Sequence, residues 1–163
     1  MRTTTIILST VVAAGAIGGI ALSAQAGARS GSDPHATHQP TGRYTFVEHA
    51  RTDTVVDLGA RGDSRGDLLA FANPVFDARN THRVGSDEGS CVRTAPGRSW
   101  ECEWTLRLPD GHLVVQGPFF DRHDSVLAIT GGTGTWRQAR GQMVLHARNA
   151  AGTSFDFRYH VTR

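Results

Sequence analysis

The sequence predicts an all-β domain, built as a sandwich or a closed barrel of short antiparallel strands. Apolar and polar side chains alternate strictly along residues 99–108 and again along residues 153–161, which is the pattern of strands with one buried face. Turn-forming groups separate the apolar segments, among them Pro96-Gly97, Pro109-Asp110-Gly111 and Gly131-Gly132. After residue 26, no stretch carries the long period of an amphipathic helix.

The two alternating segments indicate which side chains face the core. Because successive side chains of a strand point to opposite faces, one row of each segment is expected to be buried. These rows are Trp100, Cys102, Trp104, Leu106 and Leu108 in the first segment, and Phe155, Phe157, Tyr159 and Val161 in the second. Weaker strand patterns cover residues 44–49, 54–59, 67–73, 112–117, 125–130 and 142–148, and residues 135–140 are expected to form one helical turn.

The first 26 residues have the layout of a secretory signal peptide. Arg2 is followed by an apolar run over residues 6–22 and by Ala24 and Ala26, which predicts cleavage after Ala26. The alternative is a transmembrane anchor, but the run is at the short limit for a span and lacks a charged residue on its far side. We therefore expect a secreted, extracellular protein with no stable membrane anchor. It would have a flexible leader over residues 27–42 and a β-domain over residues 43–163.

The charge pattern excludes one class of partner. All 17 basic residues are arginines, against 15 acidic residues, and loss of residues 1–26 leaves a formal net charge of 16 − 15 = +1. The arginines are scattered and form no basic stripe, so nucleic-acid binding is not expected. His35 and His38 are three residues apart, but no cluster of carboxylates or cysteines completes a site around them, so no metal is expected.

Several short motifs resemble functional signatures but lack the context that each one needs. The glycines of residues 131–134 are followed by a strand, whereas a phosphate-binding loop is followed by a helix. Residues 62–66 fit the G-x-S-x-G pattern of a nucleophile elbow, in a domain too short and too β-rich for that fold. The Arg-Gly-Asp triplets at 61–63 and 65–67 are interpreted as turns, and so is the loop with Asp121, His123 and Asp124.

Four blocks of sequence, in order, closely resemble the plant allene oxide cyclases: GDLLAFANPVFD (66–77), GSCV (89–92), GHLVVQGPFF (111–120) and SVLAITGGTGTWRQARG (125–141). The last block also resembles the dirigent proteins, which share the same barrel. The likeness covers residues 43–163 and implies an eight-stranded antiparallel barrel of lipocalin-like outline, with an apolar and aromatic cavity. Proteins of these families need no metal or cofactor and are often trimeric, so the resemblance implies no cofactor and suggests a homotrimer.

The resemblance also implies a class of activity. Allene oxide cyclases close an unstable fatty-acid epoxide into a cyclopentenone, and dirigent proteins steer the coupling or cyclisation of phenolic intermediates. The cavity glutamate of the cyclases matches Glu48, the asparagine that helps to hold a bound water matches Asn73, and the cavity cysteine matches Cys91. Phe71 matches a cavity aromatic residue, and Trp104 replaces a cavity tyrosine.

These residues suggest a mechanism in which the barrel holds a flexible apolar molecule in one folded shape and so lowers its cyclisation barrier. Glu48 is the candidate catalytic residue that steers developing positive charge or accepts a proton, and Asn73 is the candidate hydrogen-bond donor to an oxygen. The candidate substrate-binding residues are Phe71, Trp100, Trp104, Phe155, Phe157 and Tyr159. The alternative is that these aromatic side chains simply fill the interior of a small barrel.

The two cysteines are expected to form a disulfide. A turn centred on Pro96 and Gly97 places Cys91 opposite Cys102, in a chain expected to reach a compartment where disulfides persist. A strict two-residue turn would put the cysteines at a hydrogen-bonded position, where the Cα atoms lie farther apart. Because Pro-Gly disfavours the turns of tight hairpins, we expect a wider loop. If the disulfide forms, Cys91 is not a free cavity thiol.

Three functions fit the sequence. The first is a cofactor-free cyclase or isomerase that binds a small hydrophobic or phenolic substrate and directs its cyclisation or coupling. The second is a secreted module that binds such a molecule without catalysis, and the third is a structural domain with a filled interior. A Glu48 side chain that points into a cavity beside Asn73 favours catalysis, and one that faces solvent favours transport or storage.

Overall fold

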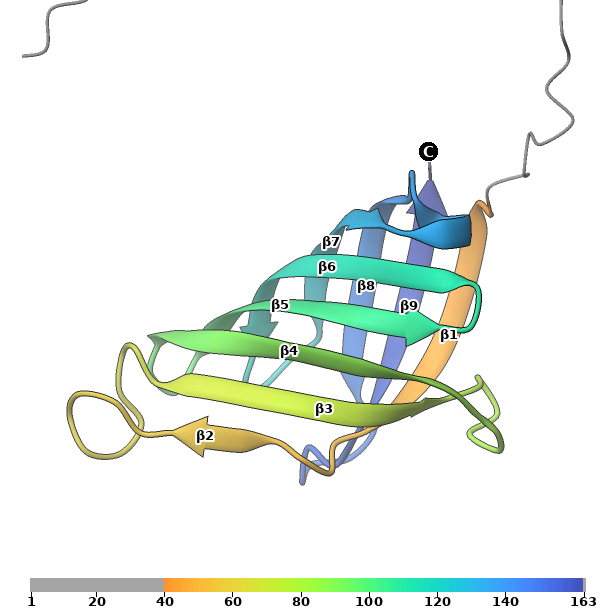
Figure 1. The fold of residues 1–163 in the computed structure, drawn as a ribbon. Coiled ribbons are helices and arrows are strands. Elements are labelled where there is room, and N and C mark those ends of the chain that lie inside the picture. The colour runs from red at the N-terminus through yellow and green to blue at the C-terminus, as the bar shows by residue number, and fades with distance from the viewer. Residues whose placement is uncertain (1–39, 163) are drawn as a thin grey trace, which may run out of the picture. The chain divides into compact units, whose positions relative to one another are not determined.

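The computed structural model describes residues 40–162, so the predictions for residues 1–26 and for His35 and His38 lie outside the described range. The described residues form nine β-strands and one 3-10 helix (Figure 1). In chain order these are β1 (Gly42–His49), β2 (Thr54–Val56), β3 (Leu68–Phe76), β4 (Arg83–Ala95), β5 (Ser99–Leu108), β6 (Gly111–Phe120), β7 (Ser125–Gly132), η1 (Gly134–Trp136), β8 (Arg140–Ala147) and β9 (Ser154–Thr162). Among residues 40–162, no helix is long and apolar enough to cross a membrane.

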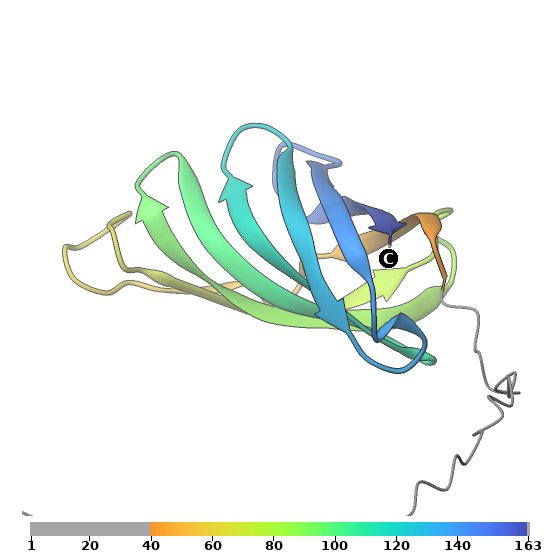
Figure 2. The same ribbon diagram turned by 90° about the horizontal axis from the view of Figure 1, so that it is seen from above.

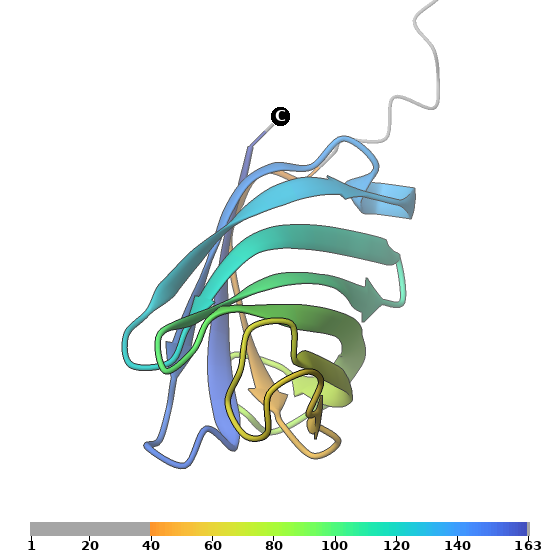
Figure 3. The same ribbon diagram turned by 90° about the vertical axis from the view of Figure 1, so that its left-hand side faces the viewer.

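The strands form a closed antiparallel barrel. Consecutive strands from β3 to β9 pair with each other, β9 pairs with β1, and β1 pairs with β3 to complete an eight-stranded ring. β2 pairs with β3 and lies outside this ring as a short edge strand. Figures 2 and 3 show the strands curving around a common interior. The predicted eight-stranded antiparallel barrel is therefore confirmed, with one additional strand.

The two side-chain rows predicted to face the core are buried. Trp100, Cys102, Trp104 and Leu106 of β5 are buried, Leu108 is half-buried, and Phe155, Phe157, Tyr159 and Val161 of β9 are buried. Burial of one large apolar side chain contributes roughly 1.5–3 kcal/mol to the free energy of unfolding. The buried side chains of these two strands therefore contribute substantially to the stability of the barrel.

The sequence patterns missed one strand of the ring, β4, and predicted too great a length for β2, which lies outside the ring. β4 was not predicted because its inward row contains two glycines and two charged residues, and so has little apolar character: Gly85, Asp87, Gly89, Cys91 and Arg93. Gly89 lies opposite Trp104, where a Cβ atom would collide with the tryptophan side chain. β4 thus lacks large side chains where its neighbour supplies them. The strand predicted over residues 54–59 is only the three-residue strand β2.

One end of the barrel is covered by η1. Trp136 is buried, packs edge-on against Tyr44 with ring centroids 5.1 Å apart, and donates its indole N–H to Asp110 at 3.2 Å. The predicted helical turn is therefore present, over residues 134–136, and Gly141 follows with a φ of 121°. The opposite end is bordered by the loops of residues 50–53, 57–67, 96–98, 121–124 and 148–153.

The predicted disulfide joins Cys91 of β4 to Cys102 of β5. The turn between the strands is wider than two residues, because the register shifts between Arg93 and Ala95 and the N–H of Arg98 donates to the Ala95 carbonyl at 3.0 Å. The cysteine Cα atoms lie 4.0 Å apart, which is the close spacing of a non-hydrogen-bonded pair. The register shift therefore removes the geometric conflict that a two-residue turn would have created.

Candidate functional site

A narrow hollow enters the barrel from the end that the five loops border. It is lined by Glu48, Asp53, Leu69, Phe71, Cys91, Cys102, Trp104, Phe119, Leu145, Phe155 and Phe157. The space not occupied by atoms is about 340 Å³ when the open mouth is counted, but only about 30 Å³ is wide enough for the centre of a water molecule. The hollow therefore has room for water in its present shape, and a larger guest requires side chains to move.

Aromatic contacts form most of the wall. Phe71 packs edge-on against Trp104 with ring centroids 6.0 Å apart, and Trp104 lies 5.6 Å from Phe157. Phe119 and Phe155 make a further edge-on pair at 6.0 Å. Pairs of this geometry contribute about 0.5–1.5 kcal/mol beyond the burial of their surface. The wall is thus apolar and well packed, and the acidic residues Glu48 and Asp53 lie within it.

The structure brings most of the predicted site residues to this hollow. Glu48, the four aromatic residues Phe71, Trp104, Phe155 and Phe157, and both cysteines of the disulfide line it. Asn73 lies beside Glu48, whereas Tyr159 and Trp100 are buried without lining the hollow. The ring of Trp100 instead packs against the guanidinium of Arg93, with 4.0 Å between the guanidinium carbon and the ring centroid.

Four residues that line the hollow were not among the predicted site residues. Leu69 and Leu145 are buried positions of β3 and β8, and the alternation of those strands could have identified them. Phe119 is half-buried at the end of β6 and follows the same alternation. Asp53 lies in the irregular loop between β1 and β2, where no periodic pattern indicates which way a side chain points.

Glu48 combines burial with a specific polar partner. The residue lies near the end of β1, is 4% exposed, and accepts a hydrogen bond from the Asn73 side-chain amide at 2.6 Å. β1 brings Glu48 to this position because it pairs with β9 on one side and with β3 on the other, where Glu48 lies opposite Val75. The carboxyl group is therefore held at the junction of three strands.

Asn73 is oriented by hydrogen bonds to both ends of its amide. Its side-chain oxygen accepts from the backbone N–H groups of Arg51 at 2.8 Å and Thr52 at 3.0 Å. Its NH₂ group donates to Glu48 at 2.6 Å and to Asp53 at 2.8 Å. Because the backbone donors determine which end is oxygen, both amide hydrogens point at carboxylates. Asn73 thus positions Glu48 and uses both of its side-chain hydrogens within the protein.

Asp87 is a further buried carboxyl group, and sequence reasoning missed it. It lies on the inward row of β4, directly opposite Asn73 of β3 and Leu106 of β5, and is 0% exposed. Its carboxyl group lies beside that of Glu48. The alternation that places Cys91 inward also places Asp87 inward, but β4 itself was not predicted. We refer to Glu48, Asp53, Asn73 and Asp87 as the carboxyl cluster.

Burial raises the pKa of two acids in this cluster. Loss of hydration raises the pKa of Glu48 to about 7, although the hydrogen bond from Asn73 opposes this effect. Loss of hydration and the nearby Glu48 raise the pKa of Asp87 to about 9. Within residues 40–162, no ion pair joins an arginine or histidine to either carboxyl group. Both carboxyl groups therefore bind a proton more readily than an exposed carboxyl group does.

Two neutral polar groups lie close to the carboxyl cluster. The Tyr159 hydroxyl lies beside the Trp104 indole N–H, and neither forms a hydrogen bond of good geometry with the residues that the structure describes. Burial raises the pKa of Tyr159, so its hydroxyl stays protonated. In the described part of the chain, no three His, Cys, Asp or Glu side chains are placed to hold a metal ion.

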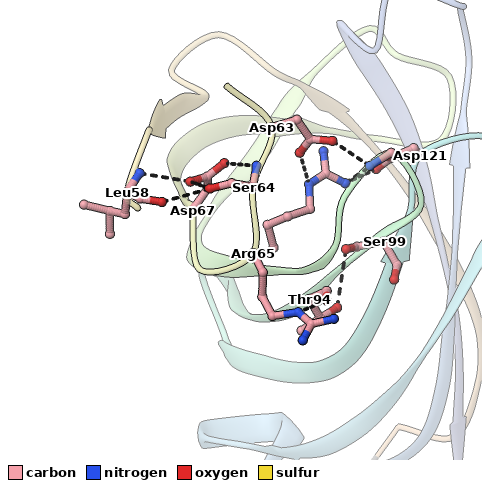
Figure 4. Close-up of polar contacts among 10 residues, drawn as sticks. Leu58, Asp63, Ser64, Arg65, Asp67, Thr94, Ser99 and Asp121 are labelled. Carbon is pink, nitrogen blue, oxygen red and sulfur yellow. Dashed lines mark hydrogen bonds and ion pairs between the residues drawn. The ribbon is translucent and has the colours of Figure 1, made fainter. Parts of the chain in front are cut away.

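The loop of residues 57–67 contains both Arg-Gly-Asp triplets, and its aspartates are engaged within the protein (Figure 4). Asp63 forms an ion pair with Nε of Arg93 at 2.6 Å. Asp67 is 2% exposed and accepts from the backbone N–H groups of Leu58 at 2.9 Å and Ser64 at 2.7 Å. The Ser64 hydroxyl donates to the Leu58 carbonyl at 2.9 Å. These contacts support the interpretation of residues 61–67 as turns.

Arg93 connects this loop to the loop between β6 and β7. Nε of its guanidinium lies 2.6 Å from a carboxyl oxygen of Asp63, and Nη1 lies 2.7 Å from a carboxyl oxygen of Asp121. The Arg93 side chain is 10% exposed and stacks on Trp100. We refer to Arg93, Asp63 and Asp121 as the arginine cluster. This cluster holds the loops of residues 57–67 and 121–124 together.

A wider outer hollow of about 530 Å³ borders the narrow one. The side chains of Phe119, Leu145 and Phe155 line both hollows, so they form the wall between them. In the outer hollow, Nδ1 of His146 lies 2.7 Å from a carboxyl oxygen of Asp124. The outer hollow is therefore the approach to the narrow one from the side of the β6–β7 and β8–β9 loops.

Comparison with known proteins gives a family and a set of similar folds. Residues 41–150 match the family model described as allene oxide cyclase. A solved structure of a pyocyanin demethylase has a TM-score of 0.63 and 23% identity, over 74% of this chain and 99% of that one. The structure of a pterocarpan synthase dirigent protein has a TM-score of 0.60 and 18% sequence identity, over 74% of this chain and 95% of that one. The structure of a Diels–Alderase from Streptomyces koyangensis has a TM-score of 0.56 and 12% sequence identity, over 76% of this chain and 68% of that one.

Proposed function

The chain belongs to the allene oxide cyclase family, and from this premise we propose that it is a secreted enzyme that works without a cofactor. It binds a small hydrophobic or phenolic molecule in the barrel and directs the cyclisation or coupling of that molecule. Two structures that share its fold are named as a dirigent protein and a Diels–Alderase, which are proteins of ring-forming or coupling chemistry. We take the class of reaction in this proposal from these similar structures, and the residues of the hollow in this chain support it.

One observation carries the proposal. The carboxyl group of Glu48 lines an apolar hollow and is held there by Asn73, instead of facing solvent. A carrier of hydrophobic molecules needs the apolar wall but not a buried acid, and burial of an acid costs stability. The placement of Glu48 therefore favours catalysis over transport or storage.

Glu48 contributes to catalysis in its ionised or its protonated form. As a carboxylate beside the rings of Trp104 and Phe157, it stabilises positive charge that develops on a carbon framework, and the ring faces add to this effect. A pKa of about 7 also allows it to exchange a proton with the substrate near neutral pH. A positioned acid or base of this kind accelerates a reaction by roughly 10²–10⁴-fold.

The narrowness of the hollow requires an opening step. A guest larger than a few water molecules fits after the Phe119–Phe155 pair moves apart, which joins the narrow hollow to the outer one. Phe119 is half-buried, so its side chain has room to rotate toward the loops. Closing of the aromatic pair over the guest would then exclude water from the reacting atoms.

The test begins with identification of the guest. Native mass spectrometry of the secreted protein detects a co-purified small molecule, and turnover of that compound is then measured for the wild type and for Glu48→Gln. We expect turnover to fall by roughly 10²–10⁴-fold with binding retained. The matched control is Glu103→Gln, which changes an exposed glutamate on the outer face of β5 and should leave turnover unchanged. Unchanged turnover in Glu48→Gln would overturn the proposal.

A further inference from the structure

Asp87 is the most deeply buried acid of the described chain. It is 0% exposed, and neither of its carboxyl oxygens accepts a hydrogen bond of good geometry from a donor in the described residues. A carboxylate in such a position would be an unpaired buried charge, which native structures avoid. A protonated carboxylic acid avoids this charge, and it can donate a hydrogen bond to a neighbouring oxygen.

The groups that face Asp87 include an acceptor but no cation. Glu48 of β1 lies beside it, Asp53 lies in the β1–β2 loop, and the Tyr159 hydroxyl faces it from β9. Asn73, directly opposite on β3, already donates both amide hydrogens to Glu48 and Asp53. The surrounding charges are thus negative, and Glu48 is the acceptor within reach.

We propose that Asp87 is a protonated carboxylic acid at neutral pH and donates a hydrogen bond to the Glu48 carboxylate, so that the two residues hold one proton between them. Asp87 does not line the hollow, and it therefore acts on the substrate through Glu48 as a positioning residue. The catalytic consequence rests on the proposed function, whereas the protonation of Asp87 is independent of it.

The pair gives Glu48 a way to exchange a proton without leaving a bare buried charge. When Glu48 takes a proton from a substrate C–H or O–H bond, the pair holds two protons and is neutral, and the bonding electrons stay with the substrate. When Glu48 returns the proton to another substrate atom, the pair regains its single proton and its single negative charge. Asp87 keeps its own proton throughout and supplies the hydrogen bond that stabilises the Glu48 carboxylate.

Infrared spectroscopy tests the protonation without any substrate. A protonated carboxylic acid has a carbonyl stretch that is separate from the carboxylate bands and shifts on hydrogen–deuterium exchange. We expect this band in the wild-type protein at pH 7, and we expect it to move to lower frequency when the chain is labelled with ¹³C-aspartate. Absence of the band, or a band insensitive to the aspartate label, would overturn the proposal.

Variants test the assignment in a second way. The band that is sensitive to the aspartate label should disappear in Asp87→Asn and persist in Glu48→Gln and Asp53→Asn. A band that disappears in Glu48→Gln and persists in Asp87→Asn would place the proton on Glu48 and contradict the proposal. The labelling experiment uses the unmodified chain, so it decides the question even where a variant does not fold.

The link from Asp87 to Glu48 is tested with the pH dependence of turnover, once a substrate is known. Asp87→Asn keeps a hydrogen-bond donor next to Glu48, whereas Asp87→Leu removes it. We expect the apparent pKa of turnover to rise in Asp87→Leu relative to Asp87→Asn, because Glu48 loses the donor to its carboxylate. Equal profiles in the two variants would refute the link. If Glu48→Gln is fully active but the Asp87 band is present, the proposed function fails while the protonation stands.

Discussion

Two groups of charged residues near the mouth of the barrel contain similar acids in opposite surroundings. In the arginine cluster, one guanidinium lies between Asp63 and Asp121, so each carboxylate has a cation within 2.7 Å. In the carboxyl cluster, Glu48 and Asp87 lie together with no cation paired to either of them in residues 40–162. The acids of the first cluster have a cationic partner, whereas the acids of the second have none among the described residues, and we propose that they share a proton instead.

This difference distinguishes a group of ion pairs from a group of acids that can exchange a proton. In the first cluster, the guanidinium of Arg93 contacts carboxyl groups from two loops and so holds these loops together. The proton of the second cluster can be exchanged, because burial raises the pKa of Glu48 to about 7. The comparison therefore teaches that the missing cation, and not the presence of acids, marks the candidate active site.

Removal of Arg93 should break the comparison with the largest effect on stability. In Arg93→Met, Asp63 and Asp121 are left without their cation, and the stacking on Trp100 is lost. Because Asp63 is partly exposed, we expect a loss at the lower end of the range for a broken buried pair, about 3 kcal/mol in the free energy of unfolding. Urea denaturation measures this loss. A change below about 0.5 kcal/mol would show that the arginine cluster does not hold the loops.

Removal of the disulfide tests a covalent link close to both clusters. The double variant Cys91→Ala/Cys102→Ala opens a loop with a sequence separation of 11 residues, which should cost about 3 kcal/mol or less. Thermal unfolding with and without a reducing agent measures the effect. Reductant should lower the melting temperature of the wild type and leave that of the double variant unchanged. An equal response in both proteins would contradict a structural role for the disulfide.

The pH dependence of stability should have opposite signs for Asp87 of the carboxyl cluster and for Asp67 of the loop at residues 57–67. The folded-state pKa of Asp87 lies above its unfolded value, so its contribution to stability is present at acidic pH and is lost as the pH rises toward about 9. We expect the free energy of unfolding to fall by up to about 1.4 kcal/mol per pH unit for this one proton. Asp87→Asn should flatten the curve between pH 6 and 9, as measured by urea denaturation at each pH. A wild-type curve that is flat over this range would contradict the prediction.

Asp67, which holds the loop next to the arginine cluster, should behave in the opposite way. Backbone hydrogen bonds from Ser64 and Leu58 lower the pKa of Asp67, so its stabilising contribution is present at neutral pH and is lost as the pH falls. Asp67→Asn should therefore reduce the dependence of stability on pH in the acidic range. Acid-induced unfolding of wild type and variant measures this difference. Identical acid midpoints would show that the loop contacts are not linked to unfolding.

The smallest expected effect concerns Arg61, the arginine of the first Arg-Gly-Asp triplet. Its side chain is exposed, and the change Arg61→Ala should alter the free energy of unfolding by less than about 0.5 kcal/mol. Asp63→Ala, two residues away, should be clearly more destabilising because Asp63 contacts Arg93. Equal effects of the two substitutions in urea denaturation would contradict the different roles that the structure gives them.

Sequence patterns predicted the parts of the molecule that depend on alternation. The inward rows of β5 and β9 follow from local periodicity, and the pairing of Cys91 with Cys102 follows from a nearby turn. β4 escaped prediction because glycines and charged residues occupy its inward row. Asp87 was missed for the same reason, because it lies in the inward row of β4.

The arginine cluster could not be predicted for a different reason. Asp63 and Asp121 contact Arg93 from loops on either side of it in the sequence, and loops have no period that tells where a side chain points. The same reason hid Asp53, which reaches Asn73 from the β1–β2 loop. For Glu48 and Asn73, the resemblance to a family supplied what periodicity did not. The catalytic roles assigned to them stay predictions.

The closure of the ring has a consequence for how the chain fluctuates. β1 and β3 meet over two residue pairs, Val47 with Phe76 and Glu48 with Val75, whereas every other neighbouring pair of strands in the ring is joined over at least four. Transient separation of β1 from β3 breaks the fewest backbone hydrogen bonds in the ring. Amide exchange at these positions should therefore be faster than in β5. Because Glu48 is one of these residues, each such opening briefly exposes its buried carboxyl group to water.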